Sequence, residues 1–149
     1  MNHNLATSAT QHRPNGAEWI GGEPSVLVFD VNETLTNSPS NPHGESPLEH
    51  AGLAHFFERR FTIETVRAYK PAQQVYHLVA QELDVPPSTC FMVAAHVWDT
   101  VGAQSAGYTA GLVTRPGNAP LPVASLPQPN LVAPDLPALA GQLIQRWRS

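Results

Sequence analysis

The chain has 149 residues, of which 42% are hydrophobic and 13% charged, and its formal net charge is −4. Eight Lys and Arg residues in total argue against a nucleic-acid partner, and no apolar stretch is long enough to span a membrane. A single cysteine, Cys90, excludes an internal disulfide. The first residues lack the charged start and apolar core of a signal peptide, so we expect a cytoplasmic protein.

The first 24 residues are polar and show no hydrophobic period. Such a composition buries too little apolar surface to order a chain, so it predicts a disordered or loosely packed N-terminal tail over residues 1–24. We expect a single folded domain over residues 25–149.

The first strong structural signal is an apolar run over 26–29 that leads directly into Asp30. The run is too short for a helix and has no polar alternation, which predicts a strand buried on both faces. In open α/β sheets, ligands bind beyond the carboxyl ends of the strands. Asp30 is therefore a candidate site residue, and an Asp that merely begins a turn is the alternative interpretation.

The middle of the chain predicts two helices with a strand between them. Ser46-Pro47-Leu48-Glu49 has the pattern of a capping box with Pro at the first helical position, and we expect this helix to run to about Arg59. The segment Phe61–Val66 alternates apolar and polar residues, as a half-buried strand does. A second helix is expected from Pro71 to about Asp84.

The C-terminal half contains two continuous apolar runs, over 90–95 and 109–113, which predict buried strands with a short helix between them. A proline-rich loop over 115–128, a short strand over 130–133 and a helix over 136–147 follow. Strands separated by single helices imply a Rossmann-like, three-layer α/β core with a mostly parallel sheet.

Three charged residues are notable for their positions. Asp30 and Asp99 follow predicted buried strands, and Lys70, the only lysine of the chain, follows another strand. A lysine between two carboxylates favours the ionised form of both, and an ionised Asp beside an apolar pocket is a competent nucleophile. On spacing alone, a structural ion pair at the ends of the strands is an equal alternative.

Four segments resemble, in order, the motifs of the haloacid dehalogenase superfamily. They are most similar to the (S)-2-haloacid dehalogenase (type II) branch, and they comprise Phe29–Leu35, Leu35–Pro39, Tyr69–Pro71 and Val93–Asp99. The likeness covers roughly residues 25–145. Four motifs in the family's order are more specific than any single one.

The resemblance implies a chemistry and a role for each charged residue. Asp30 would be the nucleophile that displaces halide from the α-carbon of a small 2-haloacid and forms an ester, which water then cleaves. Lys70 corresponds to the cation beside the nucleophile, and Asp99 to the acid that holds the lysine and orients water. The resemblance implies neither a metal nor another cofactor.

The resemblance also assigns supporting residues. Thr36 and Asn37 correspond to the donors that hold the substrate carboxylate, Tyr76 to a tyrosine near the site, and Thr34 to the threonine that supports the nucleophile. Two of these have ordinary alternatives: Tyr76 as a core residue of an amphipathic helix, and Thr34 as a residue that hydrogen-bonds its own turn.

The chain departs from the family's pattern just before Trp98-Asp99. Ala94 and His96 stand where the family has Ser and Asn. Two hydrogen-bonding groups are thereby lost and an imidazole is gained. His96 is a further site candidate, and a solvated loop histidine is the alternative.

The larger departure concerns the helical cap domain that the family places between its first two motifs. Here Asp30 and Thr36 are six positions apart, so the cap domain and one core strand are missing. We expect a site that is open to water, which weakens electrostatic stabilisation, and therefore weak or no activity. Either Phe61–Val66 pairs with the central strand, or unpaired backbone groups leave a marginally stable sheet or a homo-oligomer that covers the edge.

Two other functions remain open. A capless phosphatase of the same superfamily would need a second Asp two positions after the nucleophile, where this chain has Asn32. It would also need further acidic groups near Asp99 for Mg²⁺, where Ala95 and His96 stand. The third interpretation is a non-catalytic remnant or binding module.

Overall fold

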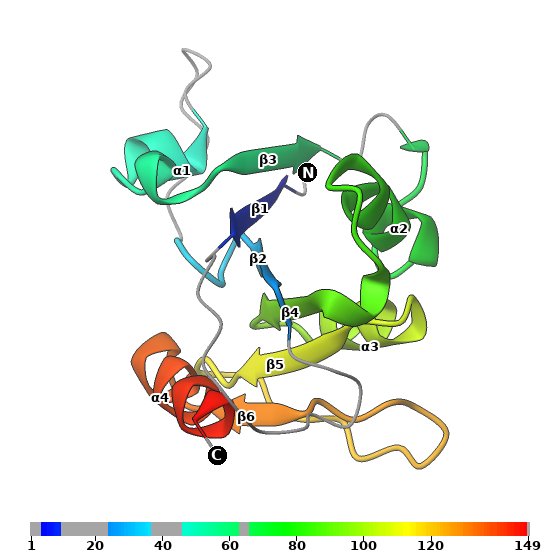
Figure 1. Cartoon of the computed structure of the whole chain (residues 1–149). Coiled ribbons are helices and arrows are strands. Elements are labelled where there is room, and N and C mark those ends of the chain that lie inside the picture. Colours follow the sequence, from blue (N-terminus) through cyan, green and yellow to red (C-terminus); the bar gives the residue numbers. More distant parts are fainter. Residues whose placement is uncertain (1–3, 10–23, 37–45, 63–65, 149) are drawn as a thin grey trace.

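The structure is a computed structural model that describes residues 4–9, 24–36, 46–62 and 66–148. Its centre is a six-stranded sheet in the order β3-β1-β2-β4-β5-β6 (Figure 1). The strands are β1 Asn4–Ala9, β2 Val26–Asp30, β3 Arg59–Thr62, β4 Cys90–Ala94, β5 Thr109–Val113 and β6 Leu131–Ala133. The α-helices are α1 Pro47–His50, α2 Gln73–Glu82, α3 Val97–Ser105 and α4 Leu136–Trp147, and short 3₁₀ turns cover Ala54–Phe56 and Pro87–Thr89.

The four strands β2, β4, β5 and β6 run parallel, which confirms the predicted α/β class. Helices α2 and α3 cover one face of the sheet, and α4 covers the other (Figure 1). All five residues of β4 are buried because helices pack on both of its faces. One core cluster, including Val75, Tyr76 and Met92, lies beneath α2 and α3, and a second, including Phe91 and Leu139, lies beneath α4.

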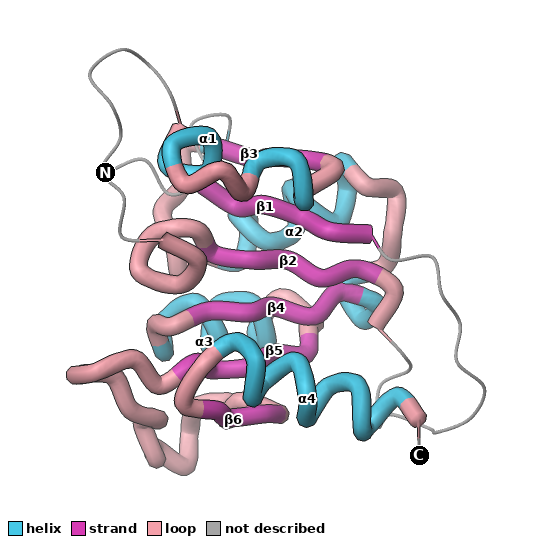
Figure 2. The backbone as a smooth tube through the Cα atoms, turned by 90° about the vertical axis from the view of Figure 1, so that its left-hand side faces the viewer, coloured by secondary structure: helices cyan, strands magenta, loops and turns pink. Residues whose placement is uncertain are grey.

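Strand β1 closes the sheet where a core strand was expected to be missing. It is antiparallel to both of its neighbours, and Leu5 pairs with Asp30 of β2 on one side and with Phe61 of β3 on the other (Figure 2). The prediction of a disordered or loosely packed tail is therefore wrong for Asn4–Ala9, while residues 1–3 and 10–23 lie outside the described residues. The predicted pairing of the 61–66 segment with the central strand is therefore wrong, and the predicted gap is filled, because β1 supplies backbone partners to β2 and β3.

Two boundaries in the segment after the first motif also differ from expectation. The capping box at Ser46 forms as predicted, but α1 ends at His50 rather than near Arg59. Gly52 has a φ of 70°, in the left-handed region that commonly ends helices. Arg59 instead begins β3, which ends at Thr62, and residues 63–65 lie outside the described part. In the described ranges, no helix has the length and apolarity needed to cross a membrane.

Candidate active site

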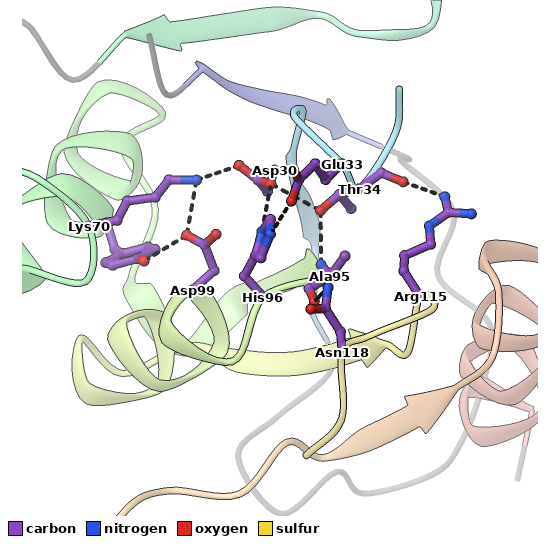
Figure 3. A network of polar contacts seen from close by, with 10 residues as sticks. Asp30, Glu33, Thr34, Lys70, Ala95, His96, Asp99, Arg115 and Asn118 are labelled. Carbon is purple, nitrogen blue, oxygen red and sulfur yellow. Dashed lines mark hydrogen bonds and ion pairs between the residues drawn. The ribbon is translucent and has the colours of Figure 1, made fainter. Parts of the chain in front are cut away.

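Asp30, Lys70 and Asp99 converge at the carboxyl edge of the sheet (Figure 3). Asp30 ends β2, Lys70 precedes α2, and Asp99 lies in the first turn of α3. Lys70 Nζ is 2.5 Å from Asp30 Oδ1 and 2.9 Å from Asp99 Oδ1. The three side chains are only 1–3% exposed. The structure thus brings together the three charged residues that the sequence placed at one edge.

The electrostatics of this cluster favour a charged lysine. Burial lowers the pKa of Lys70, but attraction by Asp99 and Asp30 outweighs it and raises the pKa above its usual value. Burial raises the pKa of Asp99, and the charge of Asp30 adds to the increase, while Lys70 acts in the opposite direction. Lys70 therefore stays protonated, and Asp99 is a stronger proton acceptor than an ordinary Asp.

Thr34 connects the loop after β2 to the end of β4. Its hydroxyl donates to Asp30 Oδ2 at 3.0 Å and accepts from the backbone N–H of Ala95 at 2.8 Å. The residue is fully buried. These contacts orient the Asp30 carboxylate, so Thr34 does more than hydrogen-bond its own turn.

Tyr76 belongs both to the core and to the site. Its hydroxyl donates to Asp99 Oδ1 at 3.0 Å, and its ring packs edge-on against Tyr108, with 6.1 Å between the ring centroids. Burial, followed by the charge of Asp99, raises the pKa of Tyr76. The two interpretations of Tyr76 are therefore compatible.

His96 is not the solvated loop histidine of the alternative interpretation, because its side chain is only 13% exposed. Its Nε2 lies 2.5 Å from Glu33 Oε2, and its Nδ1 lies 4.0 Å from Asp30 Oδ2. The ring stacks on Trp98, with 4.3 Å between the centroids. The Glu33–His96 pair thus lies beside the candidate nucleophile (Figure 3).

The burial of the cluster contradicts the expectation of a site open to water. Asp30, Lys70 and Asp99 are almost fully buried although the segment between the first two motifs is short. A cavity of about 610 Å³ lies between the turn after β2 and the start of the loop after β5. Its lining consists of Glu33, Leu35, Thr36, Arg115, Pro116 and Asn118. Thr36 is therefore placed at a cavity, whereas Asn37 lies outside the described residues.

The sequence did not single out Glu33, Arg115 or Asn118. Arg115 donates from Nη2 to the carbonyl oxygen of Thr34 at 2.6 Å, and Asn118 donates to the carbonyl oxygen of Ala95 at 2.7 Å. These contacts join the loop after β5 to the first motif and to the end of β4. The sequence predicted a proline-rich loop over 115–128, but the contacts of this loop depend on the tertiary structure.

Asp30, His96 and Asp99 offer ligand atoms that lie within 4.8 Å of one another, a spacing that a metal ion could use. The ammonium of Lys70 already lies against both carboxylates and would repel a divalent cation there. A metal ion therefore does not fit this donor set while Lys70 is charged.

Comparisons with known proteins agree with this geometry. The family of haloacid dehalogenase-like hydrolases matches residues 35–107. The (S)-2-haloacid dehalogenase of Pseudomonas sp. (strain YL) is 32% identical over 74 residues, which are 50% of this chain and 32% of that protein. The (S)-2-haloacid dehalogenase H-109 of Pseudomonas putida is 30% identical over 83 residues, 56% of this chain and 37% of that protein.

The solved L-2-haloacid dehalogenase RSc1362 superposes with a TM-score of 0.58 at 26% identity, over 71% of this chain and 45% of that one. The chain belongs to the haloacid dehalogenase superfamily. Over the matched part of the chain, the similarity is to (S)-2-haloacid dehalogenases. The matches to the two curated relatives span about a third of each relative's length, 32% and 37%.

The family match of this haloacid dehalogenase-like chain contains Lys70 and Asp99 but begins five positions after Asp30. The position of Asp30 at the end of β2, and its contact with Lys70, are therefore what connect it to the matched residues.

Proposed function

We propose that this chain is a hydrolase of the (S)-2-haloacid dehalogenase type, with Asp30 as its nucleophile. The observation that carries the proposal is the buried contact of Lys70 with both Asp30 and Asp99. Lys70 Nζ lies against a carboxylate oxygen of Asp30, and a carboxylate is the nucleophile that displacement at carbon requires. The similarity to (S)-2-haloacid dehalogenases supports a small 2-haloacid, or a related carboxylate, as the substrate class.

In the first step, a carboxylate oxygen of Asp30 attacks C2 of the haloacid. The new C–O bond forms as the carbon–halogen bond breaks, and the halide leaves with the bonding electron pair. The product is an ester between Asp30 and the 2-hydroxy acid. Contacts with Lys70 and Thr34 hold the two oxygens of Asp30, which limits the orientations in which attack occurs.

In the second step, water attacks the carbonyl carbon of the Asp30 ester. Asp99 orients the water and accepts a proton from it, as suits a carboxylate whose pKa burial raises. The ester C–O bond then breaks, the departing oxygen takes up this proton, and the 2-hydroxy acid leaves. The regenerated carboxyl of Asp30 releases its own proton to solvent, so that one halide and one proton are formed in each turnover.

We propose that this activity is weak. The substrate carbon must approach the nucleophile to about 3–3.5 Å, whereas the side chain of Asp30 is only 3% exposed. The Glu33–His96 pair lies beside Asp30 and must separate, or shift as a unit, to admit a substrate. A short connection also replaces the cap domain of the family.

The test is chloride release from (S)-2-chloropropionate at high enzyme concentration. Asp30→Asn should abolish release, whereas Asp84→Asn, which alters an exposed aspartate, should leave it unchanged. A single turnover with excess enzyme in ¹⁸O-water should place the label on the Asp30 carboxylate. Absence of chloride release by the folded chain at every enzyme concentration would reject the activity, and label in the product alone would reject the ester.

A phosphatase reaction receives less support. Asn32 replaces the second aspartate, and the ammonium of Lys70 lies against both carboxylates that would bind Mg²⁺. The phosphatase reaction would become the better supported of the two if the chain hydrolysed p-nitrophenyl phosphate with Mg²⁺ and if Asp30→Asn abolished this hydrolysis.

A further inference from the structure

The cavity beside the first motif is lined by a cation that neither of the reaction steps above uses. Arg115 lies at the start of the loop after β5 and shares the cavity wall with Thr36 and Asn118. Its Nη2 is bonded to the carbonyl oxygen of Thr34 at 2.6 Å. This bond anchors the guanidinium next to the turn that follows Asp30 (Figure 3).

The guanidinium of Arg115 has a hydrogen-bond donor that is not used. Its Nε is buried and has no hydrogen-bond partner among the described residues. A guanidinium carries five N–H donors in a fixed planar fork, and a buried donor without a partner is costly. An acceptor is therefore missing from the immediate surroundings of Arg115, and the adjoining cavity is where a ligand could supply it.

The other ionisable residues near this cavity already have partners. Glu33, which also lines it, is held by His96 at 2.5 Å. Lys70, the cation nearest to Asp30, is shared between Asp30 and Asp99. Of the basic residues in the described ranges, Arg115 is the one that lines the cavity, so it is the residue that can compensate the charge of a bound anion there.

We propose that this cavity binds the carboxylate of a small organic acid through Arg115. A guanidinium fork matches the planar geometry of a carboxylate with two parallel hydrogen bonds. Thr34 links the two sites, because its carbonyl accepts from Arg115 while its hydroxyl donates to Asp30. Thr34 thus joins the proposed carboxylate site to the candidate nucleophile.

This inference deepens the proposed function by naming a binding residue for the carboxylate of the substrate. It is tested without turnover, so that its failure is separable from the failure of the dehalogenase reaction. The ¹⁵N-labelled full chain carrying Asp30→Asn is titrated with propionate, and the arginine Nε–H resonances are followed by NMR. Propionamide, the neutral analogue of the same shape, is titrated in parallel.

The expected result is saturable binding of propionate that shifts the Nε–H resonance of Arg115, with at least tenfold weaker binding of propionamide. Arg115→Gln should weaken propionate binding at least tenfold, and Arg115→Lys should retain part of it. Arg59→Gln, which removes an exposed cation paired with Glu82, should leave the affinity unchanged.

Equal affinity for propionate and propionamide, or an unshifted Arg115 resonance at saturation, would overturn the proposal. Because the Arg115 resonance is read without changing Arg115 itself, the test does not depend on whether Arg115→Gln folds. If the titration succeeds while the unsubstituted chain releases no chloride, the anion site stands and the dehalogenase activity alone is rejected.

Discussion

Tyr76 donates its hydroxyl to the same Asp99 oxygen that Lys70 contacts, with O···O and N···O distances of 3.0 and 2.9 Å. Asp99 is only 1% exposed, so these two donors replace the hydration that the carboxylate would otherwise have. Tyr76 lies on α2 and Asp99 on α3. The packing of the two helices therefore depends on the same contacts that organise the charged cluster.

Gly102→Ala tests this coupling. A Cβ at position 102 would lie 2.6 Å from Tyr76 Cε2 and 2.7 Å from the carbonyl oxygen of Pro71, so the ring must move away from Asp99. We expect a loss of about 1–3 kcal/mol in the free energy of unfolding, measured by urea denaturation. Gly141→Ala in α4 is the matched control, since nothing lies within 4 Å of its Cβ, and it should stabilise the chain by about 1 kcal/mol. Equal effects of the two substitutions would contradict the proposed coupling.

Lys70→Met should be severely destabilising. It leaves two nearly buried carboxylates without their cation, and breaking a buried ion pair costs about 3–5 kcal/mol. Arg59→Met removes the guanidinium charge from an exposed pair with Glu82 and should cost at most about 1 kcal/mol. Urea denaturation gives both values. Adding Asp99→Asn to Lys70→Met should recover part of the loss, and a midpoint for Lys70→Met equal to that of Arg59→Met would refute the charged-cluster interpretation.

Thr34→Val keeps the shape of the side chain but removes its hydroxyl. The buried N–H of Ala95 then loses its partner, and Asp30 loses a donor, so we expect a loss of about 1–3 kcal/mol in stability. Thr34→Ser retains the hydroxyl and should recover most of this loss. If Thr34→Ser and Thr34→Val have the same melting temperature, the hydroxyl is not what stabilises the turn.

Stability should fall in alkaline solution. The pKa values of Lys70, Tyr76 and Tyr108 are all raised above their ordinary values of 10.5 and 10.0, so the folded state binds these protons more tightly than the unfolded state does. Their contribution is fully present below about pH 10 and is lost as the pH rises from there. Melting temperatures measured between pH 8 and pH 12 should therefore decline above about pH 10.

The matched variants for this pH series are two Tyr→Phe substitutions. Tyr108→Phe should flatten the alkaline decline, because it removes a buried phenol that donates to the carbonyl oxygen of Tyr76. Tyr69→Phe removes a phenol from a residue that is 73% exposed and should leave the profile unchanged. If the melting temperature of the unsubstituted chain stays constant to pH 12, the folded state does not raise the pKa values of Lys70, Tyr76 and Tyr108 as described.

Thr7→Pro tests the role of β1 in the sheet. Thr7 pairs with Val28 on one side and with Arg59 on the other, and Pro cannot donate to either ladder. We expect a loss of about 1–3 kcal/mol in stability and a tendency to self-associate through the exposed edges of β2 and β3. Size-exclusion chromatography and urea denaturation measure both effects, with Thr7→Val as the control. Unchanged stability would mean that β1 does not hold the sheet together.

Much of the parallel half of the fold was predictable from the sequence. The apolar runs at 26–29, 90–95 and 109–113 are local signals of buried strands, and the structure confirms a strand at each. Leu27 and Phe29 of β2 are only partly buried, although that strand was predicted to be buried on both faces. The convergence of Asp30, Lys70 and Asp99 also followed, because the carboxyl ends of parallel strands lie at one edge of a sheet. The local sequence was sufficient for these features because each depends on a short continuous pattern.

The tertiary structure alone decided the rest. The polar residues of β1 carry no hydrophobic period, and they form a strand because β2 and β3 both offer unpaired backbone groups beside them. Glu33 and His96 meet across 63 positions of sequence, and Arg115 reaches Thr34 across 81. No local pattern encodes such contacts, since the free energy of each depends on the burial and the partners that the folded chain provides.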